Sequence, residues 1–381
     1  MSKYIAKWFG EGASDQVKLR RGRRRQERAV RPALDCLEGR QLLSAFARGL
    51  YGSAGNDMTV FRESNGTWYS ALNASNFNTD PNAQPTYNRP VSFQWGTTGD
   101  IPIENSNFFG HTYSSYGAAD LAVFRPSNGT WYIKDPVSGR TLSTQYGQQG
   151  DIPLPASDFF GNGHADLALF RPSDGTWYIK DPLTNQELRV QWGTTGDVPI
   201  AHANFDNDGK ADIAVYRPSD QTWHVLTSST GYARANAYNV QWGTTGDVPI
   251  LNSDFNGYGW DDFAVFRPSN GTWYVYDPRI GRTQSFQYGT NGDVPIASSD
   301  FFGNHHSDLA VFRPSNGTWY IKDPVTGTEV RKQWGVTGDE PLPNMDFDGD
   351  GKADIAVFRT TDSTWHVLTS SSGFNTRIDR Q

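Results

Sequence analysis

The sequence predicts an all-β protein, a seven-bladed β-propeller of four-stranded antiparallel blades preceded by a disordered basic N-terminal segment. One sequence unit recurs seven times along the chain. Aromatic residues make up 14% of the chain, which also holds 39 Gly and 21 Pro. That composition is typical of many short strands joined by tight turns. Apolar patterns with the helical period are absent, so the prediction contains no long helix.

The repeated unit consists of Phe or Tyr followed by Arg, a short polar turn, and Thr-Trp. Successive units are separated by 46 to 50 residues, except for one interval of 63. A fixed period of this length indicates a stacked or circular repeat architecture. The predicted blade cores lie near residues 57–68, 120–131, 166–177, 212–223, 262–273, 308–319 and 354–365.

Each full unit holds the signals for four strands. Residues 196–199 (Gly-Asp-Val-Pro) begin a first strand, because Pro is confined to strand starts and edges. The near-continuous apolar run at 212–217 indicates a second strand buried on both faces. A Ser-Asn-Gly turn, as at 127–129, then leads into the Thr-Trp strand at 130–133. The fourth strand ends at Gln-Trp-Gly, as at 191–193.

Four strands in about 46 residues match one propeller blade, and a single blade cannot bury both of its faces. Closure into a ring solves that problem, whereas an open β-solenoid is the alternative architecture. The first unit lacks the Gly-Asp-x-Pro sequence, so we expect its first strand within residues 44–51. We further expect residues 45–51 and 376–381 to lie in neighbouring or shared blades and so to close the ring. The predicted domains are a leader, 1–43, and the propeller, 44–381.

The charge distribution limits the partners. The net charge is −7, but residues 1–31 hold ten Lys or Arg and three Asp or Glu, which leaves −14 for the rest. Nucleic-acid binding by the acidic body is not expected, because phosphate contacts need a basic surface. No stretch has the roughly 18 apolar residues that a membrane helix needs. The single cysteine, Cys36, rules out an internal disulfide framework.

The basic run at 20–25 indicates a disordered leader, and a solvated tail without function is the alternative. Residues 33–45 (Ala-Leu-Asp-Cys-Leu-Glu-Gly-Arg-Gln-Leu-Leu-Ser-Ala) resemble the "LEPR..LLSA" motif of large exported bacterial proteins, with Gly39 where that motif has Pro. The resemblance implies a bacterial protein that is exported to the cell surface or the extracellular space.

Two loops between a first and a second strand are strongly acidic. Residues 204–212 (Asn-Phe-Asp-Asn-Asp-Gly-Lys-Ala-Asp) and 346–354 (Asp-Phe-Asp-Gly-Asp-Gly-Lys-Ala-Asp) share one pattern. Oxygen atoms at positions 1, 3, 5 and 9, a carbonyl at 7 and Gly at 6 suit the six to eight oxygen ligands of Ca²⁺. The carboxylates would repel one another without a cation. Position 12 is Val rather than the Glu of an EF-hand, and a strand follows instead of a helix.

The pattern resembles the FG-GAP loops of integrin α-subunit propellers and of bacterial VCBS-type repeats, over residues from about 46 to the end. The resemblance implies two calcium sites. Its predicted ligands are Asn204, Asp206, Asp208, Lys210 (carbonyl) and Asp212 in one loop, and Asp346, Asp348, Asp350, Lys352 (carbonyl) and Asp354 in the other. The loops that end at Asp166, Asp262 and Asp308 carry Phe or Tyr at ligand positions, so we expect them to keep the turn without the ion. Stabilisation of the blades is the expected role of the calcium.

The repeated Arg and Trp allow two interpretations. Seven Trp faces with neighbouring Arg would form the pockets of a multivalent lectin. Residues common to all units, however, more simply pack the blades, with the Arg paired to the Asp of Gly-Asp-x-Pro. The same choice applies to the second aromatic set: Trp95, Tyr146, Trp192, Trp242, Tyr288 and Trp334.

No catalytic set emerges, so we expect no enzyme. His305 and His306 are adjacent and cannot both face one metal from a strand, while His111, His164 and His202 lie singly in loops; we therefore expect no histidine metal site. The favoured function is an exported binding or adhesion scaffold for a protein or matrix partner. The alternatives are the lectin and a polysaccharide lyase or hydrolase. The segments 73–90 and 111–118, which interrupt the repeat, are the candidate carriers of specificity.

Overall fold

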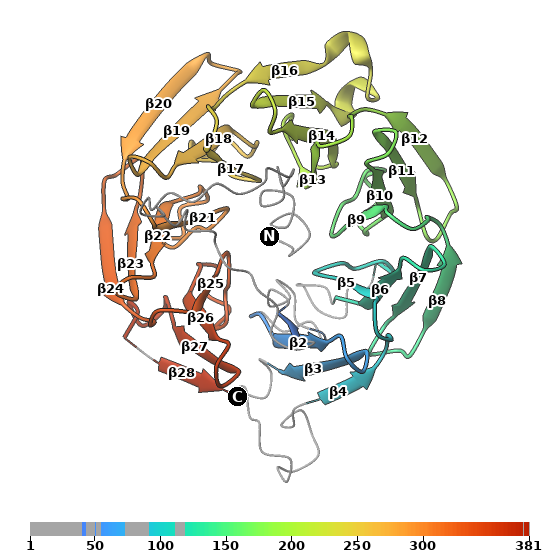
Figure 1. Ribbon diagram of the computed structural model, residues 1–381, viewed down its shortest axis with the longest axis horizontal. Helices are drawn as coiled ribbons and strands as arrows, with labels where there is room; N and C mark the ends of the chain where they lie inside the picture. Colours follow the sequence, from blue (N-terminus) through green and yellow to red (C-terminus); the bar gives the residue numbers. More distant parts are fainter. Residues whose placement is uncertain are drawn as a thin grey trace, which may run out of the picture.

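Seven four-stranded antiparallel sheets stand around a common axis as the blades of a closed ring (Figure 1). The coordinates are a computed structural model, which describes residues 40–42, 50, 55–72, 91–110, 119–375 and 377–380. The predicted seven-bladed propeller is thereby confirmed, and the open solenoid is excluded. None of the helices in these ranges has the length and apolarity needed to cross a membrane.

The strands of each blade follow the chain from the inside of the ring to its rim. Blade 1 holds β1 (Arg40–Leu42), β2 (Met58–Arg62), β3 (Thr67–Ala71) and β4 (Val91–Gln94). Blade 2 holds β5 (Ile101–Ile103), β6 (Leu121–Arg125), β7 (Thr130–Lys134) and β8 (Thr141–Gln145). Blade 3 holds β9 (Ile152–Leu154), β10 (Leu167–Arg171), β11 (Thr176–Lys180) and β12 (Glu187–Gln191). Blade 4 holds β13 (Val198–Ala203), β14 (Asp212–Arg217), β15 (Thr222–Leu226) and β16 (Tyr238–Gln241), with the short helices η2 (Ser228–Thr230) and η3 (Arg234–Asn236) before its last strand.

The remaining blades repeat the same order. Blade 5 holds β17 (Val248–Ile250), β18 (Phe263–Arg267), β19 (Thr272–Asp277) and β20 (Arg282–Gln287). Blade 6 holds β21 (Val294–Ile296), β22 (Leu309–Arg313), β23 (Thr318–Lys322) and β24 (Glu329–Gln333). Blade 7 holds β25 (Glu340–Leu342), β26 (Ile355–Arg359), β27 (Thr364–Leu368) and β28 (Arg377–Arg380).

Burial decreases from the second strand of a blade to its outermost strand. In β6 four of the five residues are buried, whereas β8 alternates between exposed and half-buried residues. The apolar run of the second strand therefore reflects contact with a neighbouring blade on each face, as the sequence predicted. The outermost strand faces solvent and carries the alternating polar pattern.

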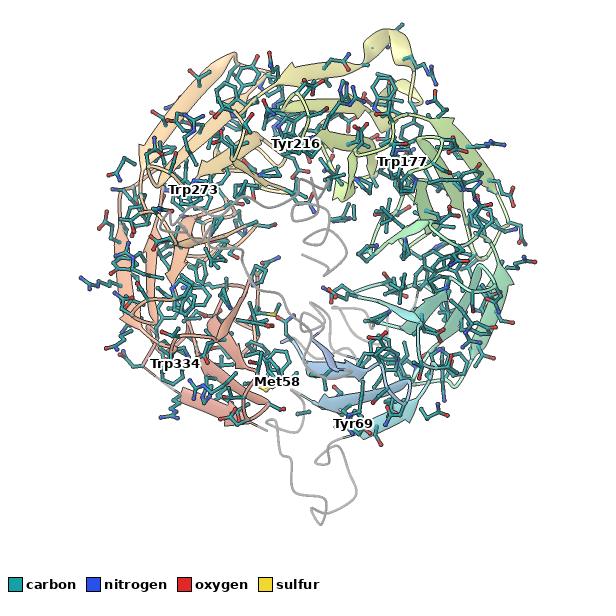
Figure 2. All side chains as sticks on the ribbon, in the orientation of Figure 1. Met58, Tyr69, Trp177, Tyr216, Trp273 and Trp334 are labelled. Atoms are coloured by element: carbon teal, nitrogen blue, oxygen red, sulfur yellow. The ribbon has the colours of Figure 1, made fainter. Side chains whose placement is uncertain are left out.

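The hydrophobic core consists of seven separate clusters, one between each pair of neighbouring blades. Each cluster combines the repeated Phe and Trp of one blade with branched residues of the next; Phe61 and Trp68, for example, pack with Leu121 and Val123. Figure 2 shows the side chains that fill the wall of the ring between the sheets.

The ring closes where blade 7 meets blade 1. Met58 of β2 packs in one cluster with Met345, Phe347 and Trp365 of blade 7. The Asn56 amide donates to the Asp346 carbonyl at 2.6 Å, and the Asp346 amide donates to Asn56 Oδ1 at 2.5 Å. Side-chain packing and two hydrogen bonds thus join the two terminal blades without exchanging a strand between them.

Residues 377–380 form the outer strand of blade 7, next to blade 1, but the inner strand of blade 1 is not where the sequence placed it. That strand is β1, Arg40–Leu42, upstream of 44–51 and within the range assigned to the leader. Leu50 belongs to the following loop, where its amide donates to Asp57. In blades 2, 3, 5, 6 and 7 the loop before the second strand is longer than ten residues, as between β9 and β10. The same spacing in blade 1 would leave too few residues between an inner strand at 44–51 and Met58. The rest of residues 33–45, and residues 376 and 381, lie outside the described ranges.

A bidentate Arg–Asp ion pair recurs in blades 2 to 7, as the sequence predicted. The Arg at the end of the second strand donates through Nε and Nη2 to the Asp before the first strand, at 2.7 to 2.9 Å. The pairs are Arg125–Asp100, Arg171–Asp151, Arg217–Asp197, Arg267–Asp247, Arg313–Asp293 and Arg359–Asp339. The Asp side chains are no more than 1% exposed.

We expect Arg313→Leu to lower the free energy of unfolding by about 3–5 kcal/mol, because it leaves the buried Asp293 carboxylate without its cation. Arg62→Leu in blade 1 is the matched control: Arg62 also lies over a Tyr ring, but no described carboxylate pairs with it. Urea unfolding measures both. Equal losses in the two variants would show that the Tyr contact, and not the ion pair, matters.

Candidate metal centres in the blade loops

The loop between the first and second strand of every blade ends in a buried aspartate. These residues are Asp57, Asp120, Asp166, Asp212, Asp262, Asp308 and Asp354, each no more than 2% exposed. One carboxylate oxygen accepts a hydrogen bond from a backbone amide earlier in the same loop, at 2.6 to 2.9 Å. The final aspartate therefore shapes the loop in all seven blades, including those whose sequence does not suit calcium.

The loops of blades 2 to 7 also join each of these blades to the next. The carbonyl at the first loop position accepts the amide of a residue just before the final aspartate of the following loop, at 2.5 to 2.8 Å. The carbonyls belong to Asn107, Asp158, Asn204, Asp254, Asp300 and Asp346, and their donors are Ala165, Ala211, Asp261, Ser307, Ala353 and Asn56. A cation bound to one of these loops would therefore brace two blades at once.

The loop of blade 7 gathers three of its predicted ligands. Asp346, Asp348 and Asp354 each place a carboxylate oxygen within 4.8 Å of the other two. The Asp346 side chain also accepts the amides of Gly349 at 2.6 Å and Gly351 at 2.9 Å, which folds the loop around it. The three carboxylates form an oxygen-rich site that can hold a cation.

Asp350, a fourth predicted ligand of blade 7, lies outside this group, and the fifth is the backbone carbonyl of Lys352 and not its side chain. Asp350 accepts the Lys352 amide and the Ser370 hydroxyl, both at 2.9 Å. The Lys352 side chain extends over the preceding loop, since a methyl group added at Gly303 would meet its Cε at 2.8 Å. Lys352 thus contacts blade 6 through its side chain.

The loop of blade 4 is less convergent than its sequence suggests. Asp206 Oδ2 accepts the amide and hydroxyl of Ser229, and Asp208 accepts the Lys210 amide at 2.9 Å. Asp212 accepts the Phe205 amide through one oxygen and the Ser228 amide through the other. Within the described part of the chain, Asp206, Asp208 and Asp212 do not form a group like that of blade 7. The Asn204 Oδ1 atom is buried and has no hydrogen-bond partner in the part of the chain that the structure describes.

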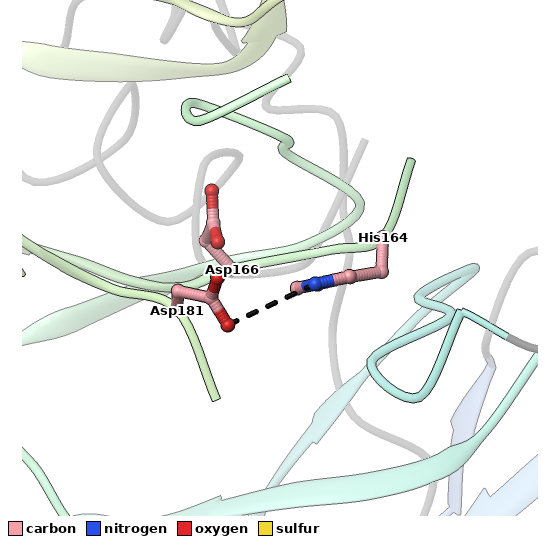
Figure 3. Close-up of side chains that lie close together, drawn as sticks. All are labelled: His164, Asp166 and Asp181. Carbon is pink, nitrogen blue, oxygen red and sulfur yellow. Dashed lines mark ion pairs between the residues drawn. The ribbon is translucent and has the colours of Figure 1, made fainter. Parts of the chain in front are cut away.

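Two groups that the sequence did not predict contain histidine. His164, Asp166 and Asp181 converge in blade 3 (Figure 3), and His306, Asp308 and Asp323 converge in blade 6. The expectation that His164 lies singly in its loop is therefore wrong, and His306 likewise lies beside two carboxylates. Their third partner comes from the Lys-Asp-Pro turn after the third strand, 15 residues beyond the loop aspartate. The sequence did contain a signal for these groups. The same two units carry both the Lys-Asp-Pro turn and a His two residues before the loop aspartate.

Burial dominates the electrostatics of the loops. It raises the pKa of Asp120, Asp166, Asp212, Asp262 and Asp354 to about 7 and that of Asp308 to about 8, and neighbouring carboxylates add to the effect. Burial likewise raises the pKa of Asp346. For Asp181 and Asp323 burial acts in the same direction, but hydrogen bonds from Thr184 and Thr326 outweigh it, so that their pKa is lowered. These buried Asp and His/Asp groups can bind a metal, because a cation stabilises the charged carboxylates.

The repeated tryptophans serve the fold. The seven Trp of the third strands are no more than 4% exposed, so they offer no face on which a sugar can stack. Five of them donate through Nε1 to the carbonyl of the aromatic residue after the fourth strand: Trp68, Trp131, Trp177, Trp273 and Trp319. The second aromatic set is half-buried, and Trp95, Trp242 and Trp334 donate to carbonyls of the next blade.

Comparisons with known proteins assign the chain to no family. No protein-family model matches the chain, and no curated protein matches it in sequence. Among solved structures, "Streptogramin B lyase structure" has a TM-score of 0.48 and 12% identity, covering 69% of this chain and 79% of that one. The apo AztD structure from Citrobacter koseri has a TM-score of 0.48 and 12% identity, over 89% and 86% of the two chains. A chain of the mitotic checkpoint complex has a TM-score of 0.45 and 9% identity, over 95% and 96%.

The raised pKa of the loop aspartates predicts how the metal-free protein responds to pH. Between pH 3.8 and about 7, Asp262 holds its proton in the folded state but loses it on unfolding. The free energy of unfolding therefore falls as pH rises through this window and levels off above it. We expect a steeper fall in melting temperature from pH 5 to pH 8 for the wild type in EGTA than for Asp262→Asn, which cannot titrate. Identical slopes in the two proteins would contradict the raised pKa.

Proposed function

We propose that the protein is an exported binding scaffold, a propeller stabilised by calcium that presents its non-repeating segments to a protein or matrix partner. The observation that carries this proposal is the internal use of the repeated side chains. The Trp of every unit is buried, and the Arg of six units is paired to a buried Asp. The repeat therefore builds the ring, and specificity is left to the segments that interrupt it, 73–90 and 111–118.

Calcium is the cation that the acidic loops support best. Asp346, Asp348 and Asp354 offer oxygen ligands only, which hard cations such as Ca²⁺ prefer. The resemblance of the 346–354 sequence to FG-GAP loops points to the same ion. The position of this loop adds a role: Asp346 is hydrogen-bonded to Asn56, at the junction of blades 7 and 1. An ion bound there would strengthen the closure of the ring.

Export is supported by the resemblance of residues 33–45 to a bacterial export motif. The lectin alternative assumed that sugars stack on the repeated Trp, and the burial of these Trp gives it no support. We propose no enzymatic activity for this scaffold.

Calcium removal is expected to destabilise the propeller. A ligand present at about 100 times its dissociation constant adds about 2.7 kcal/mol to the free energy of unfolding. We therefore expect EGTA to lower the melting temperature by several degrees and Ca²⁺ to restore it. Asp348→Asn should reduce this response, because it removes one of the three convergent carboxylates.

Asp174→Asn is the control, since other units carry Asn at the same turn position, as at Asn128. It should respond to Ca²⁺ as the wild type does. A wild-type melting temperature that is the same in EGTA and in Ca²⁺, with no calcium found by elemental analysis, would rule out the calcium assignment.

Replacement of the interrupting segments tests the binding role directly. We expect Gly/Ser linkers in place of 73–90 and 111–118 to leave the fold intact and to abolish capture of the partner from a bacterial cell-envelope fraction. Circular dichroism checks the fold, and quantitative pull-down checks the capture. Undiminished capture by the doubly replaced protein would contradict the proposal. A panel of polysaccharides, assayed both for binding and for cleavage products, separates the lectin and enzyme alternatives from it.

A further inference from the structure

The histidine-containing groups of blades 3 and 6 combine side chains from two separate segments of one blade. In blade 6, His306 and Asp308 stand at the end of the loop before β22, and Asp323 follows β23. His306 Nε2 lies 3.6 Å from Asp323 Oδ1, and the corresponding distance between His164 and Asp181 in blade 3 is 3.8 Å. Ligand atoms of a tetrahedral site with bonds of about 2.1 Å lie about 3.4 Å apart, so the separations suit a shared ion.

Polar atoms in these two groups lack partners despite their burial. Asp308 is 1% exposed, yet its Oδ1 atom has no hydrogen-bond partner among the described residues. Asp166 Oδ1, in a residue that is 0% exposed, is also without a partner. Buried polar groups are nearly always paired, and an isolated buried carboxylate is especially unfavourable. The atoms therefore point to a ligand.

The other blades show how the same carboxylate is satisfied where histidine is absent. In blades 4 and 7 the Oδ1 atoms of Asp212 and Asp354 accept the amides of Ser228 and Ser370, at 2.8 and 2.6 Å. Those blades have Thr in place of the Asp of Lys-Asp-Pro. Blades 3 and 6 differ in two ways: they have the Asp of Lys-Asp-Pro, and the Oδ1 atom of their loop aspartate accepts no such amide.

Blades 2 and 5 do carry both carboxylates, and in each of them an arginine lies close by. Arg279 donates to Asp277 at 3.1 Å and offsets part of the rise that burial causes in the pKa of Asp262, and Arg140 acts on Asp120 in the same way. The position of Arg279 is held by Val325 in blade 6 and Leu183 in blade 3. The chain thus supplies a cation to two of the four carboxylate pairs and a histidine to the other two.

We propose that blades 3 and 6 each bind a divalent transition-metal ion of the zinc class, held by His164, Asp166 and Asp181 and by His306, Asp308 and Asp323. An imidazole nitrogen together with carboxylates suits Zn²⁺ and its neighbours, whereas Ca²⁺ and Mg²⁺ take oxygen ligands. The ion would tie the loop to the end of the third strand. These sites are separate from the calcium loops of blades 4 and 7 and do not depend on the proposed function.

Titration of tag-free, metal-free protein with Zn²⁺ in excess Ca²⁺ tests the proposal. We expect two equivalents of bound zinc by isothermal titration calorimetry and elemental analysis. His306→Gln should bind one equivalent, and the double variant His164→Gln/His306→Gln should bind none. His305→Asn is the matched control: residue 305 is an exposed neighbour at φ 66°, a conformation that Asn tolerates, and this variant should still bind two.

Zinc bound undiminished by the double variant would overturn the proposal, as would the absence of zinc binding by the wild type in Ca²⁺. X-ray absorption of the zinc-loaded wild type keeps the test valid if a variant does not fold. Imidazole scattering with nitrogen or oxygen ligands at about 2.0–2.2 Å is expected. A shell of oxygen atoms without imidazole would contradict the assignment.

Discussion

Each blade of this protein has two apolar faces and depends on a neighbour to cover each of them. The seven core clusters all lie between blades. Hydrophobic burial is the dominant favourable term in folding, so no blade is stable alone and no terminal blade can be left uncovered. The ring is the geometry that satisfies this requirement for all of them, and its weakest point is the junction that the chain does not cross. At that junction, Met58 and Met345 supply the apolar contact and Asn56 and Asp346 supply the hydrogen bonds.

The acidic loops also make each blade depend on its neighbour, through hydrogen bonds instead of apolar contacts. They lie beside the blade junctions, where their first carbonyl is bonded to the following blade. The side chain at loop position 7 lies against the preceding loop: Lys210 on Gly161, His306 on Gly257 and Lys352 on Gly303. A metal ion bound in such a loop would therefore act on the contact between blades as well as on the loop itself.

Most of the fold could be predicted from the period of the sequence repeat. The seven blades, the buried second strands and the Arg–Asp pairs all follow from residues that recur at fixed offsets. The position of β1 did not follow, because blade 1 lacks the Gly-Asp-x-Pro sequence that marks the first strand elsewhere. Its inner strand is defined by the length of the loop before Met58, and Leu50 occupies the loop instead.

The candidate sites were predicted less well because metal ligands converge in space and not along the chain. The motif at 346–354 predicted four carboxylate ligands. Three of these carboxylates converge in the structure, while Asp350 accepts the Lys352 amide and the Ser370 hydroxyl. His164 looked isolated, and His306 was considered only with its neighbour His305, because the third partner of each group belongs to a turn after another strand. Antiparallel pairing of the second and third strands brings that turn back beside the loop.

Hydrogen exchange in a variant of the closing junction tests the dependence of every blade on the closed ring. Met345→Ala removes a side chain that is 2% exposed and is expected to cost about 2–5 kcal/mol. If all blades rely on closure, the slowest-exchanging amides should lose protection by the same factor throughout the ring, including β14 and β15 of blade 4. Loss of protection confined to blades 7 and 1 would contradict that dependence.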